Sequence, residues 1–316
     1  MGKYLTGEVI KALRIQKGLT QKELGAGIVN SVQISRIEQG KVMPSKFTLE
    51  KLFGRLGYDP SAYSAILMSK EEMLHQSKMD EISNLMKSKR NDKAAKLLEF
   101  LESDTNFVTD NYCRQFLLYN QSRLAYRIGE EVEAVMGGLM EAIKITVPAY
   151  KEEDVSEYWL SKQEMAIIET MSGMYFRMDQ KERAINLLYQ VKENFEKRYM
   201  DVESKQSRYM PIIYNLTKYL GLADRHEEVL ALCDKGIEAC KRYSAFRFLP
   251  LISFNKACSL FELGDIESCK TLLTDVYFTF RLQERFENVK LMEEYAKDVL
   301  GISLQEIIIE EVSRKT

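Results

Sequence analysis

The chain is poor in the residues that interrupt helices. Only five prolines and 16 glycines are spread over 316 residues, which is too few for the many turns of a β-sandwich or β-barrel. Hydrophobic residues make up 45% of the sequence and charged residues 29%, and this balance is typical of folded globular proteins. The length is enough for about two domains. We therefore expect an all-α protein.

The sequence also lacks the marks of a membrane or secreted protein. No apolar run approaches the roughly 20 residues that cross a bilayer, and residues 1–5 contain no apolar signal-peptide core. The cysteines are odd in number, scattered and without a CxxC pair: Cys113, Cys233, Cys240, Cys258 and Cys269. Such cysteines are typical of reduced thiols packed in a core. We expect a cytoplasmic protein that makes no contact with a membrane.

Catalytic and metal-binding patterns are equally scarce. The sequence has no Gly-rich phosphate loop, no HExxH motif and no Cys/His spacing suited to a metal. Both histidines, His75 and His226, lie in charged stretches, and no nucleophile is spaced to use His226. We expect His75 to be solvated. The sequence predicts a protein that is not an enzyme and that uses no cofactor and no metal.

Charge is distributed unevenly along the chain. Residues 1–66, the head, contain ten Lys or Arg and five Asp or Glu, whereas the other 250 residues contain 35 and 42. The head is therefore basic and the rest of the chain, the body, is acidic. This division is typical of a protein whose head alone contacts a polyanion.

Five short helices are expected in the head. Apolar residues from Leu5 to Leu13 recur with helical spacing, and Gly18 ends the first helix. Typical N-capping residues mark the next three helix starts: Thr20 in a capping box with Glu23, Asn30 or Ser31, and Ser45. A fifth helix is expected after residues 59–61.

The third of these helices has an exposed face suited to base recognition. Ile34 and Ile37 define its buried side, so the opposite side is free. A guanidinium matches guanine, an amide matches adenine, a hydroxyl matches either, and a valine methyl matches thymine, while helix N-termini and lysines hold phosphates. We expect DNA contacts from Gln21, Ser31, Val32, Gln33, Ser35, Arg36, Gln39, Lys41 and Lys46. The alternative is an ordinary polar surface on a small helical bundle.

Residues 14–24 and 34–45 resemble the helix-turn-helix of lambdoid phage repressors and their bacterial relatives. The resemblance implies that the second helix of the motif lies in the major groove of operator DNA. It also implies that Ser31, Val32 and Arg36 contact bases.

The same resemblance implies supporting roles for other residues of the head. Gln21 is expected to contact a phosphate and cap its helix, while an Arg14–Glu38 ion pair braces the first helix against the third. The turn at residues 24–30 is one residue shorter than in the usual family pattern. This shortened turn resembles that of the peptide-pheromone-sensing regulators of Gram-positive bacteria, the PlcR and Rgg type.

A helical unit recurs in the body. Residues 67–88 are expected to form a polar linker helix. Short turns with an acidic residue then recur every 38 to 49 residues, each followed by an amphipathic helix: residues 91–92, 129–130, 178–179, 223–224 and 264–265. This spacing predicts an α-solenoid of about five TPR-like helix pairs over residues 89–316, serving peptide binding and dimerisation. Residues 304–312 are expected to lie in a C-terminal capping helix.

An aromatic–Asn step repeats in the first helix of three pairs, with threonine at the corresponding place in a fourth. First helices line the concave side of such solenoids, and a row of amides there can hold the backbone of an extended peptide. Cationic residues one turn beyond suit a carboxylate. The predicted peptide contacts are Tyr119, Asn120, Arg123, Thr170, Tyr214, Asn215, Lys218 and Asn255. The alternative is that the asparagines make ordinary hydrogen bonds between helices.

The resemblance to the PlcR and Rgg type favours the peptide interpretation, because that type binds a signalling peptide on a similar row of asparagines. We therefore expect a quorum-sensing transcription regulator that binds double-stranded operator DNA and is switched by a short oligopeptide. Operator half-sites require two heads, which predicts a homodimer. The alternatives are a constitutive repressor whose solenoid only dimerises, and an adaptor whose solenoid docks a protein.

Overall fold

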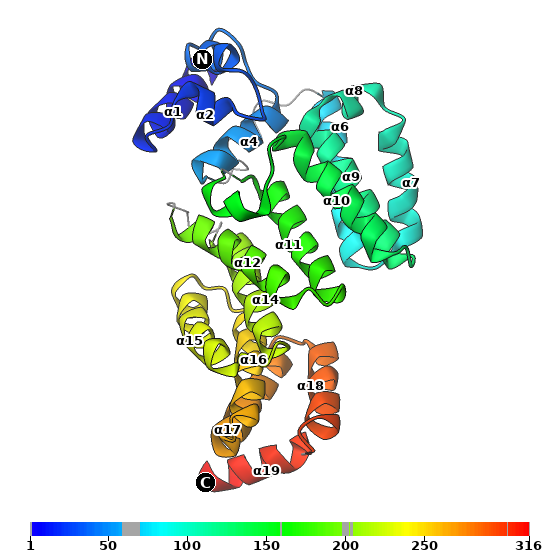
Figure 1. The fold of residues 1–316 in the computed structure, drawn as a ribbon, viewed down its shortest axis with the longest axis vertical. Helices are drawn as coiled ribbons and strands as arrows, with labels where there is room; N and C mark the ends of the chain where they lie inside the picture. The colour runs from blue at the N-terminus through cyan, green and yellow to red at the C-terminus, as the bar shows by residue number, and fades with distance from the viewer. Residues whose placement is uncertain are drawn as a thin grey trace. The chain divides into compact units, whose positions relative to one another are not determined.

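The structure, a computed structural model, describes residues 2–58, 70–158, 160–197, 202, 205–301 and 303–315. Every secondary-structure element within these ranges is helical, which confirms the predicted all-α fold. The chain divides into two compact units, Met1–Ser204 and Lys205–Thr316 (Figure 1).

The head begins the first unit. Its described helices are α1 (Gly2–Gln16), α2 (Gln21–Gly25), α3 (Ser31–Glu38) and α4 (Lys46–Leu56). The Thr20–Glu23 capping box is present, with N···O distances of 3.1 and 2.7 Å, and the side chains of Asn30 and Ser45 cap α3 and α4. Apolar side chains from all four helices form the core of the head. The predicted fifth helix lies outside the described residues.

Three helix pairs follow in the described part of the first unit: α6 (Lys70–Lys87) with α7 (Asn91–Glu102), α9 (Asn111–Arg127) with α10 (Val132–Thr146), and α11 (Lys162–Arg177) with α12 (Lys181–Glu196). A short helix, α8 (Thr105–Thr109), joins α7 to α9. Met79, Ile82 and Met86 of α6 pack in one apolar cluster with α7 and α9. The helix predicted as a linker is therefore also the first helix of the first pair.

His75 of α6 is buried, so the prediction that it is solvated was wrong. It is 5% exposed, and its Nε2 lies 2.8 Å from Asp104 Oδ2. Its ring also meets Phe107 edge to face, with centroids 5.0 Å apart. The hydrogen bond from His75 lowers the pKa of Asp104. Because the two partners lie 29 residues apart in the sequence, the local charge pattern around His75 could not reveal this contact.

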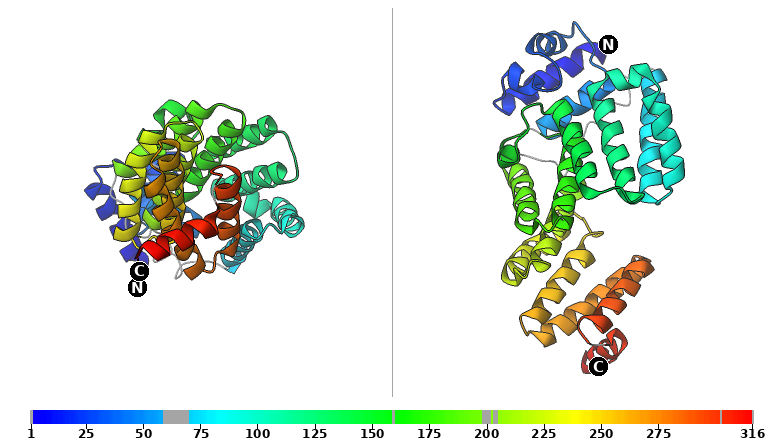
Figure 2. Two further views of the ribbon diagram at one scale, coloured as in Figure 1. Left: turned by 90° about the horizontal axis from the view of Figure 1, so that it is seen from below. Right: turned by 45° about the vertical axis from the view of Figure 1, so that its right-hand side comes forward.

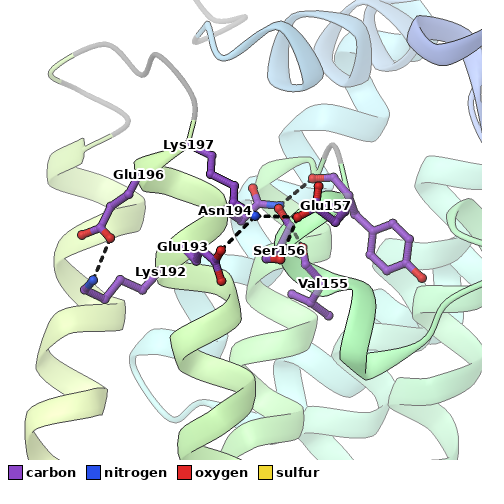
Figure 3. Close-up of polar contacts among 9 residues, drawn as sticks. Val155, Ser156, Glu157, Lys192, Glu193, Asn194, Glu196 and Lys197 are labelled. Carbon is purple, nitrogen blue, oxygen red and sulfur yellow. Dashed lines mark hydrogen bonds and ion pairs between the residues drawn. The ribbon is translucent and has the colours of Figure 1, made fainter.

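The connection between α10 and α11 contains a 3₁₀ helix, η1 (Glu152–Glu157). Asn194 of α12, 1% exposed, fixes this connection by directing its amide nitrogen toward three backbone carbonyls: Val155 (2.9 Å), Ser156 (3.2 Å) and Tyr158 (2.6 Å). Figure 3 shows these contacts converging on Asn194. The extra η1 segment accounts for the 49-residue spacing between the second and third predicted turns.

The second unit is also built from packed helices (Figure 2). After a π-helical turn, η2 (Lys205–Tyr209), it contains α14 (Met210–Gly221), α15 (His226–Arg242), α16 (Leu249–Glu262), α17 (Ile266–Leu282), α18 (Phe286–Asp298) and α19 (Leu304–Lys315). The sequence predicted the first four and α19, but not α18. Residues of α18 and α19 share an apolar cluster with α16 and α17, so both helices extend the solenoid core.

Turns inside the helix pairs contain residues with left-handed backbone. Four of the five predicted turns have such a residue: Gly129, Asp179, Asp224 and Gly264. Glycine adopts this conformation freely and aspartate tolerates it. The first turn is displaced from its predicted place at residues 91–92, because Lys89 has the positive φ (57°) and Asn91 already begins α7.

Candidate DNA-reading face and peptide-binding surface

Helix α3 presents one polar face to solvent. Ile34 and Ile37 are 0% and 3% exposed and belong to the core of the head. Six predicted contacts occupy the rest of the helix and its end; Ser31, Val32, Gln33, Arg36 and Gln39 are exposed and Ser35 is half-buried. We call these six residues the reading face. Val32, 60% exposed, places methyl groups beside the hydroxyl, amide and guanidinium groups.

A buried ion pair orients α3. Arg14 of α1 holds Glu38 of α3, with Nε to Oε1 at 2.5 Å and Nη2 to Oε2 at 3.0 Å. Gln21 of α2 donates to the same carboxylate at 2.9 Å. Burial alone would raise the pKa of Glu38, but the hydrogen bonds from Arg14 and Gln21 outweigh it and lower the pKa. The predicted bracing pair is confirmed, and it joins three helices of the head.

The residues predicted to contact phosphates lie at the edges of the reading face. Gln21 has one amide donor occupied by Glu38. Lys41 is exposed just after α3. Lys46 is the first residue of α4, and its side chain is outside the described part of the chain. The N-terminus of α3, capped by Asn30, offers further backbone N–H groups.

Helices α9 and α11 run in register with an offset of 51 residues. Three contacts share this offset: Gln163 Nε2 donates to Tyr112 O (3.1 Å), the Tyr119 and Thr170 hydroxyls lie 3.2 Å apart, and Arg177 Nε donates to Tyr126 Oη. A constant offset requires the two helices to be parallel. The fold therefore brings the predicted residues Tyr119 and Thr170 into contact. We call Tyr119, Arg123, Tyr126, Thr170 and Arg177 the α9–α11 surface.

Asn120 does not lie free beside this surface. It is 1% exposed, its Nδ2 donates to Phe116 O of its own helix (2.9 Å), and its Oδ1 accepts from Arg123 Nη1 (3.1 Å). Arg123 in turn lies over the Tyr119 ring, 5.2 Å from its centroid. In this structure Asn120 therefore holds Arg123 in place, rather than presenting its amide to a peptide.

The second unit contains the remaining predicted peptide contacts. Asn255 of α16 donates to Thr217 Oγ1 (2.9 Å) and approaches Tyr214 O (3.4 Å), so it bonds α16 to α14. The hydrogen bonds of Asn255 match the alternative interpretation of the aromatic–Asn step. Asn215 is half-buried and its amide bonds to no described residue, while Lys218 is exposed.

Two charged residues at the α9–α11 surface, Arg177 and Glu169, were not predicted from the sequence. Arg177 lies over the Tyr126 ring, 5.0 Å from its centroid, and neither Arg177 nor Arg123 contacts a carboxylate within the described ranges. Desolvation raises the pKa of the half-buried Glu169, which precedes Thr170 in α11, to about 8. A sequence signal for Arg177 does exist. Tyr126 and Arg177 lie seven residues after Tyr119 and Thr170, respectively, so the same 51-residue offset places Arg177 opposite Tyr126.

The described residues contain no group of His, Cys, Asp or Glu that could hold a metal ion. Within the same ranges, no helix is long and apolar enough to cross a membrane. The five cysteines are free, and four of them are buried. Burial raises the pKa of Cys240 and Cys269 to about 11, so these thiols stay protonated at neutral pH.

Comparison with known proteins supports the identity of the head. Residues 10–65 match the Helix-turn-helix family, a range that includes α2, the shortened turn and the whole reading face. No curated protein sequence matches the chain. The match identifies the head as a helix-turn-helix DNA-binding domain.

Several solved structures share the fold of nearly the whole chain. PlcR of Bacillus thuringiensis, in complex with the peptide PapR7 and DNA, is 22% identical over 92% of this chain and 99% of that one, with a TM-score of 0.58. The pheromone receptor Rgg2 of Streptococcus dysgalactiae is 14% identical over 93% and 99%, with a TM-score of 0.53. ComR of S. thermophilus, in complex with DNA and its signalling peptide ComS, is 14% identical over 94% and 100%, with a TM-score of 0.50. The chain therefore contains a helix-turn-helix DNA-binding domain followed by a TPR-like solenoid, and its fold is that of the PlcR and Rgg type.

Proposed function

We propose that the protein is a cytoplasmic, homodimeric transcription regulator whose operator binding is switched by a short peptide. The observation that carries the DNA part is the reading face, which is exposed and oriented by the Arg14–Glu38 pair. The peptide part is supported by the α9–α11 surface and by the fold shared with PlcR and ComR, which were solved with DNA and peptide.

Each member of the reading face has a chemical role in this proposal. Arg36 pairs with guanine O6 and N7, Gln33 and Gln39 suit adenine, and Val32 contacts a thymine methyl. Ser31 and Ser35 donate to either base or to phosphate, and Lys41 and Lys46 neutralise phosphates and set the docking register. Gln39 Nε2 lies 3.2 Å from Ser35 Oγ, so these two side chains are already held together on the helix surface.

The α9–α11 surface suits an anionic group of an extended peptide. Asn120 and the Tyr119 ring fix Arg123, while Tyr126 and the Gly173 carbonyl fix Arg177. Two guanidinium groups that have no carboxylate partner among the described residues form a pre-organised site for a carboxylate, because little side-chain freedom is lost on binding. Asn215 and Lys218 of the second unit are further proposed contacts.

Switching requires that the peptide bind one arrangement of the protein more tightly than another. Two heads in a homodimer must match two operator half-sites, which lie a whole number of helical turns apart. A peptide that changes the curvature of the solenoid changes the separation of the heads. Affinity for the operator then rises or falls with peptide concentration.

A selection experiment tests the DNA part of the proposal. Full-length protein is incubated with a random duplex DNA library, and bound sequences are recovered and sequenced over several rounds. The proposal predicts one enriched sequence with two related half-sites, and Arg36→Ala is expected to change the enriched bases at one position of each half-site. A library that shows no enrichment would favour the adaptor alternative.

Peptide capture tests the second part independently. Immobilised full-length protein is exposed to the peptide fraction of spent medium from the source organism, and retained peptides are identified by mass spectrometry. We expect a peptide that the native protein retains and that an Arg123→Ala, Arg177→Ala variant does not. Retention of no peptide, with operator binding intact, would favour the constitutive alternative, which the structural hydrogen bonds of Asn255 also fit.

A further inference from the structure

Within the first unit, the head packs against the solenoid through two segments. Gly27, in the turn before α3, meets the end of α10 so closely that a Cβ there would lie 1.8 Å from Thr146 O. Gly27 also has φ +70°, so both space and backbone conformation require glycine. The second segment is α4, which packs against α9. It also brings Gly54 close to the start of α11, where a Cβ added to Gly54 would lie 3.7 Å from Ser161 Cα.

Two cations of α4 are buried at this contact. Lys51 and Arg55 are 3% and 6% exposed, which is uncommon for charged residues. The Lys51 ammonium lies 5.4 Å from the centroid of the Tyr112 ring of α9. The carboxylates of Glu164 and Asp110, both contributed by the solenoid, interact favourably with it. A buried ammonium is costly unless such groups compensate for its lost hydration.

Glu164 is held rigidly in the solenoid. It is 1% exposed and forms the capping box of α11, because its Oε2 accepts from Ser161 N at 2.6 Å. Its Oε1 accepts from the Thr146 hydroxyl, and Gln115 donates to that hydroxyl at 2.7 Å. The carboxylate that faces the head is therefore fixed by α9, α10 and α11 together.

Arg55 extends the contact to the reading helix. Its Nη1 donates to the carbonyls of Leu24 (3.1 Å) and Ala26 in the turn that leads to α3. The same turn carries Gly27, which rests on Thr146. The solenoid therefore contacts the segment that positions α3, while Val32, Arg36 and Gln39 of the reading face stay exposed.

We propose that the surface formed by Asp110, Tyr112, Thr146 and Glu164 is a docking site for the protein's own head. The head rests on this surface in an orientation that leaves Val32, Arg36 and Gln39 available to DNA, and the Glu164 carboxylate offsets part of the cost of burying the Lys51 ammonium there. The docked head moves with α9–α11 as one body, and Lys51 and Glu164 are positioning residues for DNA reading. This proposal concerns the head alone and does not depend on a peptide.

The docking has a defined pH dependence. Burial lowers the pKa of Lys51 from 10.5 to about 8; Glu164, Asp110 and the Cys113 thiol oppose this shift, and Arg55 adds to it. An undocked, solvated Lys51 holds its proton more tightly than a docked one. Docking therefore strengthens as the pH rises from about 8 to about 10.5, by at most about tenfold per pH unit for one proton.

Distance measurements between spin labels on the full-length protein test the proposal. Labels are attached through Ala12→Cys on α1 and Lys96→Cys on α7, both at exposed positions, and double electron–electron resonance gives the distribution of distances. The charge variants are Glu164→Gln, Lys51→Met and the two combined. Glutamine preserves the capping box, and Glu133→Gln removes an exposed first-turn carboxylate of α10 as a matched control.

We expect one narrow distance for the native protein and for Glu133→Gln. Glu164→Gln leaves the Lys51 ammonium buried without its main partner and should give a broad distribution, whereas adding Lys51→Met should restore the narrow one. Raising the pH from 7 to 10 should also narrow the Glu164→Gln distribution. A narrow distribution in Glu164→Gln at pH 7, or no recovery in the combined variant, would overturn the proposal, provided that circular dichroism shows native helicity in both.

Discussion

The reading face and the α9–α11 surface differ in how far apart in the sequence their residues lie. The reading face comes from one helix, and its orientation is fixed by an ion pair between two residues 24 positions apart. The α9–α11 surface joins residues 51 positions apart, and its arginines are held by Asn120 and Tyr126, contacts that the sequence did not predict. Local chemistry therefore determines the first surface, and packing of helix pairs determines the second.

The largest effect is expected from a variant that removes the Arg14–Glu38 ion pair. Glu38→Ala leaves the Arg14 guanidinium partly buried without its carboxylate, which should destabilise the head by about 3–5 kcal/mol. Amide hydrogen exchange of α1 and α3 in the full-length protein measures this loss. Adding Arg14→Met should recover part of it, because the unpaired charge is then absent. Unchanged exchange in Glu38→Ala would contradict the bracing role.

The Arg14–Glu38 pair should also make the stability of the head depend on pH in the acid range. The pKa of Glu38 is lowered in the folded head, so its ionised form contributes stability above the ordinary glutamate pKa of about 4.3. That contribution should be lost as the pH falls through the lowered folded-state value. Exchange of the same amides from pH 6 to pH 3 measures it, and the Arg14→Met, Glu38→Ala variant should show a smaller change.

The next effect concerns base recognition. Arg36→Ala should weaken binding to the selected operator by about 1–3 kcal/mol and relax the preference at one base pair. Arg36→Lys keeps the charge but loses the bidentate geometry, so it should recover part of the affinity without the base preference. Fluorescence anisotropy with the operator and single-base variants measures both. Equal losses on all sequences would assign Arg36 to phosphate contact.

In the solenoid, Asn120 supports Arg123, whereas Asn215 is a proposed ligand contact. Asn120→Ala should lower solenoid stability by about 1–2 kcal/mol, because it removes buried hydrogen bonds, and should weaken peptide capture only by releasing Arg123. Asn215→Ala should leave stability nearly unchanged, reduce peptide capture and spare operator binding. Thermal unfolding and capture assays separate the two. A stability loss in Asn215→Ala equal to that of Asn120→Ala would remove the distinction.

The smallest effect is expected at the edge of the reading face. Lys41→Ala should weaken binding about equally on all DNA sequences and reduce the slope of log affinity against log salt by about one. Binding titrations at several salt concentrations measure that slope. A sequence-dependent loss would instead place Lys41 among the base-reading residues.

Local signals predicted the head well. The caps at Thr20, Asn30 and Ser45 and the Arg14–Glu38 pair are all present in the structure. Each capping interaction involves residues within three positions of one another, and the ion pair was supplied by a resemblance that covers the whole motif. The order of the head helices therefore followed from the residues themselves.

Long-range packing explains what the sequence did not reveal. The burial of His75 depends on Asp104 and Phe107 across a helix pair, and the η1 segment is fixed by Asn194 from α12. Helix α18 follows a turn at Glu284 rather than at glycine or aspartate, so the turn signal was absent. The repeated aromatic–Asn step predicted equivalent roles for its asparagines. In the structure, however, Asn120 bonds within its own helix, whereas Asn255 bonds α16 to α14.

In the proposed mechanism, a peptide changes how tightly the head holds its operator. The most direct test is fluorescence anisotropy of the full-length protein on the selected operator, with and without the peptide fraction captured from spent medium. We expect the peptide to shift operator affinity by at least about fivefold, the lower end of typical allosteric coupling, and we expect the Arg123→Ala, Arg177→Ala variant to lose that shift. An operator affinity that is the same at every peptide concentration, in a protein that binds the peptide, would contradict it.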